Sequence, residues 1–224
     1  MVRKSRAGEI LETFTRCVAE RGYDAANFSD IAGELGLSKG TIVHHYGTKD
    51  RLLASAHESY LRRRLAEAAL IRDRLATPTQ QLAGLLYAFV LYQVVDREAT
   101  VAFQREIVRL AGHEAMAEGR RLRADYLGLV RSVLADGVAS GEFRPCDIEV
   151  QSLLIFGSAQ WAWTWFDPDG PVSAEQVGAQ LVDLVLGGLA VRRSRLSGLT
   201  AVDGKVASTV RQSIEDVSVM QSDS

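Results

Sequence analysis

The sequence has few of the residues that mark a cross-linked, metal-bound or membrane-embedded chain. Its two cysteines, Cys17 and Cys146, lie in distant segments without histidine or cysteine at metal-ligand spacing, which argues against a disulfide framework and a zinc site. No apolar run reaches the ~18 residues of a membrane span, and the first residues lead into an amphipathic pattern, not the apolar core of a signal peptide. We therefore expect a soluble, cytoplasmic protein without metal or other cofactor and without membrane association.

Prolines are also scarce, and the four present leave long stretches free of helix breakers. Apolar residues recur at spacings of three and four, and no run alternates strictly between hairpin signals, so the sequence predicts an all-α fold. A mostly flexible tail is expected over residues 193–224, with a short helix at 206–217 as the alternative. The expected helices are 7–21, 27–35, 38–45, 48–76, 78–95, 98–115, 120–140, 147–166 and 173–191.

Charge is small in total and uneven along the chain. The net charge is -2, yet residues 1–64 carry 11 Lys and Arg against 8 Asp and Glu. The N-terminal part is therefore the better candidate for an anion-binding surface. The run Arg62 to Arg64 is expected to be a solvated helix face.

Residues 27–46 have the pattern of two short helices joined by a tight turn. Asn27 and Ser38 are favourable helix caps, and Gly36 permits the sharp turn between the helices. The apolar residues Ile31, Leu35, Leu37 and Ile42 are expected to face inward and hold the helices together. This spacing predicts a helix-turn-helix whose third helix presents a polar face to the major groove of DNA.

The same segment resembles the N-terminal signature of the TetR family, through Ser29 to Ala32, Leu35 to Ile42, His45-Tyr46, Lys49 and Leu52-Leu53. The resemblance covers about residues 8–55 and implies a dimeric repressor of a palindromic operator in double-stranded DNA. Thr41 and Lys49 would contact phosphates, and Ser38, Lys39, His44 and His45 would reach base edges or phosphates. Val43 departs from the family, which usually has a tyrosine there. The full predicted DNA-binding set is Asn27, Ser38, Lys39, Gly40, Thr41, Val43, His44, His45, Tyr46 and Lys49.

The remainder of the chain has no nucleophile elbow, phosphate loop or metal-spaced histidines, so we expect no catalytic residues and no enzyme. All three tryptophans lie between Gln160 and Phe166, where Trp161 and Trp165 would share one helix face. They are interpreted either as core and subunit interface or as the wall of an effector cavity. In TetR-like proteins the last two long helices form a four-helix dimer interface, which corresponds here to 147–166 and 173–191.

The effector is expected to be a small lipophilic molecule bound between helices. Residues 141–145, 165–171 and 176–178 resemble a branch of the family that controls lipid or steroid catabolism and responds to acyl-CoA thioesters. An acyl-CoA is therefore one candidate effector. The predicted pocket is Phe89, Tyr92, Phe103, Ile107, Arg109, Tyr126, Val130, Trp161 and Trp165.

The domain organisation that follows has a DNA-binding domain at 1–52, a helical effector-binding and dimerisation domain at 53–192, and the tail. Two alternatives stay open at this point. A helical lipid or acyl-CoA binding protein with a degenerate helix-turn-helix would account for Val43. A thioester enzyme would need His57 or His113 as a general base beside a nucleophile.

Overall fold

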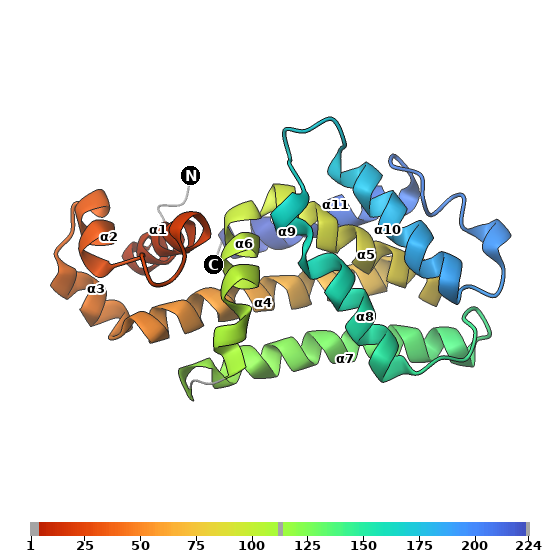
Figure 1. The fold of residues 1–224 in the computed structure, drawn as a ribbon, viewed down its shortest axis with the longest axis horizontal. Coiled ribbons are helices and arrows are strands. Elements are labelled where there is room, and N and C mark those ends of the chain that lie inside the picture. The colour runs from red at the N-terminus through yellow and green to blue at the C-terminus, as the bar shows by residue number, and fades with distance from the viewer. Residues whose placement is uncertain (1–4, 112–113, 223–224) are drawn as a thin grey trace. The chain divides into compact units, whose positions relative to one another are not determined.

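The computed structural model describes residues 5–111 and 114–222, and Figure 1 shows their helices. Within these ranges the regular structure is helical apart from one isolated bridge between Phe143 and Ala190, which confirms the predicted all-α class. Short 3-10 turns occur at Ile107–Ala111, Glu114–Met116 and Arg193–Arg195. The α-helices are α1 (Arg6–Arg21), α2 (Phe28–Leu35), α3 (Lys39–Tyr46), α4 (Lys49–Arg74), α5 (Pro78–Val95), α6 (Arg97–Glu106), α7 (Ala117–Ala139), α8 (Ile148–Gln160), α9 (Ala162–Trp165), α10 (Ala174–Leu189) and α11 (Lys205–Ser222).

The chain divides into two compact units, each formed by two stretches of sequence. Unit 1 comprises the chain up to Arg62 together with 96–123, and unit 2 comprises 63–95 with 124–222. The DNA-binding domain expected from the sequence comprised residues 1–52 alone. Unit 1 is larger because α6 packs along α1, a contact between segments that are far apart in sequence.

Unit 1 is organised around α1, which contacts α2, α3 and α6. Ile10, Phe14, Val18, Ile31 and Ile42 have no exposed surface, and their burial supplies the main favourable term for this small unit. The helices are short and their ends are capped by polar side chains and glycines.

Unit 2 is built on α5, against which α10 and α11 pack (Figure 1). Every residue of α5 from Leu82 to Tyr92 except Phe89 is buried, so this helix is apolar on almost all sides, as a central helix must be. Gly178 of α10 allows the approach, because a Cβ there would lie 2.5 Å from Cδ1 of Tyr87. The core of unit 2 therefore lies along α5.

The last segment is not the expected flexible tail but contains the helix that was its alternative, at 206–217. Residues 205–222 form α11, whose Val206, Val210, Ile214 and Val217 are buried. These residues follow the spacing of one helix face, and Arg211 pairs with Glu175 of α10 at 3.1 Å. Within residues 205–221, Ser213 is fully buried and the other Ser, Thr and charged residues are exposed or half-buried, and this polar composition alone suggested a tail.

Two expected helices are shorter than their apolar patterns indicated. The helix expected at 98–115 ends at Glu106 and continues as a 3-10 turn. The helix expected at 147–166 is interrupted at Trp161, whose carbonyl accepts both the amide and, at 2.7 Å, the hydroxyl of Thr164. A hydroxyl that binds a nearby carbonyl competes with helical hydrogen bonding. Among the described helices, none is long and apolar enough to cross a membrane.

Candidate nucleic-acid interface

The turn between α2 and α3 is closed by backbone hydrogen bonds around Gly36. This residue has φ +63°, the left-handed conformation that favours glycine, and the amide of Leu37 donates to the Ala32 carbonyl at 2.8 Å. On either side of the turn, Ile31 and Ile42 are fully buried, while Leu35 and Leu37 are partly buried. The predicted inward set therefore does hold α2 and α3 together.

Helix α3 is capped by Ser38, whose hydroxyl accepts the Thr41 amide at 3.1 Å and lies 3.0 Å from the Thr41 hydroxyl. Only Ile42 of this helix is buried. Most of the predicted DNA-binding residues lie on its surface, and Val43 is 45% exposed. The exposed members are Ser38, Lys39, Gly40, Val43, His44 and His45, and the half-buried ones are Thr41 and Tyr46.

Asn27 and Tyr46 of the predicted DNA-binding set also have structural partners inside unit 1. Asn27 caps α2 by accepting the amides of Ser29 and Asp30 at 3.0 and 2.9 Å. The Tyr46 hydroxyl donates to the Ala7 carbonyl at 2.8 Å, and burial raises its pKa. Tyr46 thus fastens the end of α3 to the start of α1.

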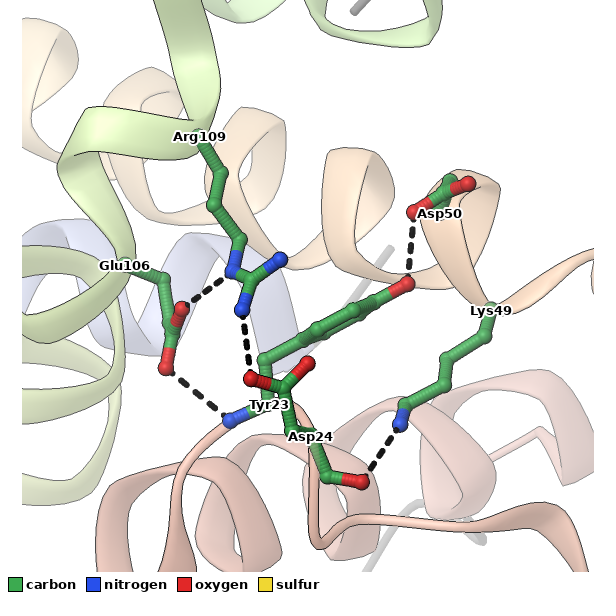
Figure 2. A network of polar contacts seen from close by, with 6 residues as sticks. All are labelled: Tyr23, Asp24, Lys49, Asp50, Glu106 and Arg109. Carbon is green, nitrogen blue, oxygen red and sulfur yellow. Dashed lines mark hydrogen bonds and ion pairs between the residues drawn. The ribbon is translucent and has the colours of Figure 1, made fainter.

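Lys49 is the first residue of α4, and its side chain reaches the turn between α1 and α2 (Figure 2). Its ammonium donates to the Asp24 carbonyl at 3.2 Å and lies 4.3 Å from the centre of the Tyr23 ring. The Tyr23 hydroxyl donates to Asp50 at 2.5 Å, and burial together with this carboxylate raises the pKa of Tyr23. The hydroxyl therefore stays protonated and keeps its donor role.

The other side of Tyr23 is held by residues from the end of α6 and the 3-10 turn after it (Figure 2). Glu106 is buried and accepts the Tyr23 amide at 2.9 Å. Arg109 donates to Glu106 at 2.7 Å and to Asp24 at 2.8 Å, and its guanidinium lies 4.5 Å from the Tyr23 ring centre. Arg109, predicted for the effector pocket, thus lies in unit 1 beside the helix-turn-helix.

A hollow of about 440 Å³ lies in unit 1 between the end of α3 and the first turns of α4. His44, His45 and Tyr46 line it from α3, and Arg51 and Ser55 line it from α4. Arg51 is exposed and lies in the first turn of α4. Sequence reasoning missed it, although a basic residue three positions after the helix cap Thr48 was the available signal.

The predicted effector-pocket residues fall into three groups. Phe103 and Ile107 belong with Arg109 to unit 1, whereas Phe89, Tyr92, Tyr126 and Val130 belong to unit 2. In unit 2 the rings of Phe89, Tyr126 and Phe156 form a cluster in which each ring contacts the other two. Their centroids are 5.2 to 5.9 Å apart. Trp161 and Trp165 are 65% and 58% exposed.

Arg64 is buried, although the run that contains it was expected to be solvated. It pairs with Glu67 at 2.9 Å, with 5% and 2% of the two side chains exposed, and its guanidinium carbon lies 3.7 Å from the centre of the Tyr92 ring. Burial and the Glu67 carboxylate raise the pKa of Tyr92 well above its ordinary value. The signal in the sequence was spacing, since Arg64 lies four and seven residues before the buried Ala68 and Ile71.

The histidines considered as general bases do not form a reaction site in the part of the chain described. His57 is 1% exposed, packs edge-on against Phe103 and has no hydrogen-bond partner for either ring nitrogen among the described residues. Burial lowers its pKa to about 4. His113 lies outside the described residues, and the described ones contain no cluster of three metal-ligating side chains.

A capped helix-turn-helix with one polar, exposed recognition helix defines the class of DNA-binding transcriptional regulators. Two family models then match the chain: "Bacterial regulatory proteins, tetR family" over residues 10–56 and "Tetracyclin repressor-like, C-terminal domain" over 75–189. The chain belongs to the TetR family and is a DNA-binding transcriptional repressor. It is not an enzyme, because this family consists of regulators.

Several known proteins resemble this chain over most of its length. The transcriptional repressor KstR2 of Mycobacterium tuberculosis H37Rv is 30% identical over 83% of this chain and 93% of its own length. The structure of the ketosteroid transcriptional regulator KstR2 from that species covers 85% of this chain and 97% of its own, with a TM-score of 0.76. PfmR of Thermus thermophilus is 30% identical over 82% and 99% of the two chains, with a TM-score of 0.71. AibR, solved with isovaleryl coenzyme A and operator DNA, shares the fold at 23% identity over 82% and 100%, with a TM-score of 0.69.

Proposed function

We propose that this repressor binds a palindromic operator as a homodimer and leaves it when a small lipophilic effector, such as an acyl-CoA thioester, occupies unit 2. The observation that carries the proposal is the division of α3 into one buried residue, Ile42, and an otherwise accessible polar surface. A helix held from one side and polar on the other has the geometry that enters a major groove. The protein would act in the cytoplasm, with the DNA it regulates.

The DNA contacts divide by chemistry into phosphate binding and base reading. Lys49 and Arg51, at the start of α4, carry the positive charge that phosphates need, and Thr41 adds a hydroxyl. Lys39 and His44 are exposed on α3 and have donors suited to base edges. The hydroxyl of Tyr46 already binds the Ala7 carbonyl, so in the proposed complex Tyr46 positions α3.

A homodimer is supported by the outward face of α8. Val150, Leu153, Leu154 and Trp161 are 52 to 65% exposed and recur at helical spacing. The opposite face of α8 is buried through Ser152, Ile155 and Ala159. An apolar stripe of this kind on an amphipathic helix is typical of a subunit interface.

Helix α10 contributes a second apolar and small surface to the proposed dimer. Leu184 is 72% exposed, and Gly188 has open space around the position of a Cβ. A glycine on a helix surface allows another helix to approach closely. Two copies related by a two-fold axis would pack α8 and α10 into a four-helix interface and place two α3 helices about one DNA turn, roughly 34 Å, apart.

The proposed effector site uses the residues of unit 2 alone. Phe89, Tyr126 and Phe156 provide aromatic surface beside the buried Val130. Arg64, held against Tyr92, is the polar group we assign to the effector's carbonyl or carboxylate. A few polar groups among apolar walls are the usual composition of such sites, and a buried ion pair is costly enough to suggest a role beyond stability.

The relatives support a lipophilic effector, and one of them supports an acyl-CoA. KstR2 is described as a ketosteroid regulator, and AibR was solved with isovaleryl coenzyme A. An effector releases DNA only if it binds better to a conformation in which the recognition helices are wrongly spaced. Helix α4 is the candidate for coupling effector binding to DNA binding. It is one continuous helix that passes residue 62, where the two units divide.

The alternative of a lipid-binding protein with a degenerate helix-turn-helix depended on Val43. That residue is exposed at the surface of an α3 that is otherwise complete and capped, so a valine there removes at most one side-chain contact. Lys49 and Arg51 provide cations next to it. The intact α2–α3 pair favours the repressor over this alternative.

The test is selection of bound duplexes from random DNA by the purified protein, followed by sedimentation of the complex. We expect a palindrome bound by two copies of the chain. Titration of that complex with isovaleryl-CoA, longer acyl-CoA esters and free CoA as control should show release by at least one ester and none by free CoA. Selection without an enriched sequence would contradict the DNA-binding part, and retention of DNA with every ester would contradict the effector part.

A further inference from the structure

Three charged residues of the segment 105–109 form hydrogen bonds with the end of α1 and the turn that follows it. Arg105 donates to the carbonyls of Ala19 and Glu20, in the last turn of α1, at 3.2 and 3.4 Å. Glu106 accepts the Tyr23 amide, and Arg109 joins Glu106 to Asp24. A cation at helix carbonyls and a buried carboxylate on a backbone amide are charge-assisted contacts, the stronger kind of hydrogen bond.

None of these side chains belongs to α2 or α3, yet Glu106 and Arg109 contact the same two residues, Tyr23 and Asp24, that Lys49 contacts. Figure 2 shows Arg109 and Lys49 approaching the Tyr23 ring from opposite sides. The ring position is fixed by Glu106 at its backbone, and the Asp24 carbonyl that receives Lys49 belongs to the residue whose side chain binds Arg109. The ammonium of Lys49 is thus located by two groups that α6 and its 3-10 extension hold in place.

We propose that Glu106 and Arg109 are positioning residues for operator binding, which act by setting the position of the Lys49 ammonium. The proposal rests on the proposed function, in which Lys49 binds a DNA phosphate. The contacts by which Arg109 joins Glu106 to Asp24 are called the Arg109 bridge. When this bridge is intact, Lys49 is preorganised beside Tyr23, so binding a phosphate costs little side-chain entropy. When the bridge is broken, the turn at Tyr23 and Asp24 loses its partner and Lys49 loses its fixed position.

The bridge also links operator affinity to α6 directly. Helix α6 begins at Arg97, and only Asp96 separates it from the end of α5 at Val95. Glu106 is the last residue of α6, so a rotation or shift of this helix moves the carboxylate against the Tyr23 amide. A hydrogen bond of 2.9 Å weakens steeply with such a change of distance and angle.

The first test is Glu106→Gln, which keeps the size of the side chain and removes its charge. At fixed salt we expect the dissociation constant for the selected operator to rise about tenfold, the scale of couplings carried by contact networks. Glu118→Gln is the matched control, because Glu118 also joins two arginines in unit 1, Arg121 at 2.7 Å and Arg62 at 2.6 Å, without touching the turn. An operator affinity of Glu106→Gln within twofold of the control, or tighter, would overturn the proposal.

The second test separates positioning from general stability. Assays are made well below the melting temperature of each variant, where reduced stability alone leaves the affinity of the folded protein unchanged. If Glu106 acts through Lys49, its substitution should cost less than about twofold in a Lys49→Ala background, since coupled residues are not additive. Effects that multiply independently would overturn the proposal.

Two further outcomes are distinguished by the design. If Glu106→Gln melts near the assay temperature, Arg109→Lys is used instead. This change keeps the charge, but the lysine side chain cannot bind two carboxylates with one planar group. We expect the same tenfold loss of operator affinity, and a wild-type affinity would overturn the proposal. If the wild-type chain shows no preferred duplex, the proposed function fails first. A preferred duplex with wild-type binding by Glu106→Gln overturns only the positioning role.

Discussion

Arg64 lies over the ring of Tyr92, with the guanidinium carbon 3.7 Å from the ring centre, and both side chains are buried in unit 2. Glu67 completes the group through its 2.9 Å ion pair with Arg64. A cation on an aromatic face gains electrostatic energy, and more when water is excluded. The pair with Glu67 compensates part of the cost of burying the charge.

Replacement of Arg64 by methionine should therefore destabilise the protein strongly. The change leaves Glu67 buried without its cation, and we expect the free energy of unfolding to fall by about 3 to 5 kcal/mol. The double variant Arg64→Met with Glu67→Leu should recover most of this loss, since two apolar groups need no partner. Urea unfolding at pH 7 measures both, and Arg62→Met, at an exposed pair, is the control. A single variant as stable as the control would contradict the account.

Ser38 should contribute separately to stability and to DNA binding. Ser38→Ala removes the acceptor for the Thr41 amide, and loss of such a cap costs about 1 kcal/mol. Ser38→Asp keeps a capping oxygen and should restore the stability, yet it brings a negative charge to the DNA-facing end of α3 and should weaken operator binding further. Thermal unfolding and fluorescence anisotropy give the two quantities. Parallel changes in both would argue against a DNA-facing Ser38.

A matched pair of substitutions tests whether α11 is part of the core of unit 2. Ile214 is 7% exposed, whereas Val219, on the same helix, is 60% exposed. Ile214→Ala should lower the free energy of unfolding by about 2 kcal/mol, because it removes buried methyl groups and leaves a cavity. Val219→Ala should have little effect. Equal effects in chemical unfolding would contradict the packing of α11 on α5.

His57 should make stability depend on pH in the acidic range. Its pKa is about 4 in the folded protein, against 6.5 for the ordinary side chain. The neighbouring carboxylate of Glu106 partly offsets the effect of burial. Since the folded pKa is the lower one, the unfolded chain takes up the proton first as pH falls below 6.5. Stability is therefore complete above pH 6.5 and declines toward pH 4, by about 1.4 kcal/mol per pH unit.

The matching experiment compares wild type with His57→Leu in urea unfolding at several pH values between 7 and 4.5. The variant has no imidazole to protonate at this position, so its stability should fall less steeply over that range. Groups that do not interact with His57 titrate alike in both proteins and cancel in the comparison. Parallel curves would show that the buried imidazole makes no such contribution.

Local features of the fold could be predicted from the sequence, because their causes lie within a few residues. Gly36, the caps Asn27 and Ser38, and the inward Ile31 and Ile42 specify the helix-turn-helix by short-range hydrogen bonding and helical spacing. The polar surface of α3 follows from the same spacing. The exposed set on α3, for which DNA contact is proposed, was therefore within reach of the sequence.

Other features depend on contacts between distant segments and could not be predicted in the same way. Arg109 lies beside Asp24, 85 residues earlier in the chain, and nothing in either local sequence indicates the pairing. Arg64 belongs to a run of three arginines, and such a charged run indicates a solvent-exposed helix face. By contrast, α11 was within reach of the sequence, because Val206, Val210 and Ile214 have helical spacing and a helix at 206–217 was the alternative to the expected tail.

The central claim is that the outward surface of α3 reads a DNA sequence. The most direct measurement compares, at one salt concentration, the affinity of the wild-type chain for the selected palindrome and for a scrambled duplex of equal composition. We predict a preference of about 10³-fold or more for the palindrome. His44→Ala should reduce that preference while leaving binding to the scrambled duplex nearly unchanged. Equal affinity of the wild-type chain for both duplexes would contradict the claim.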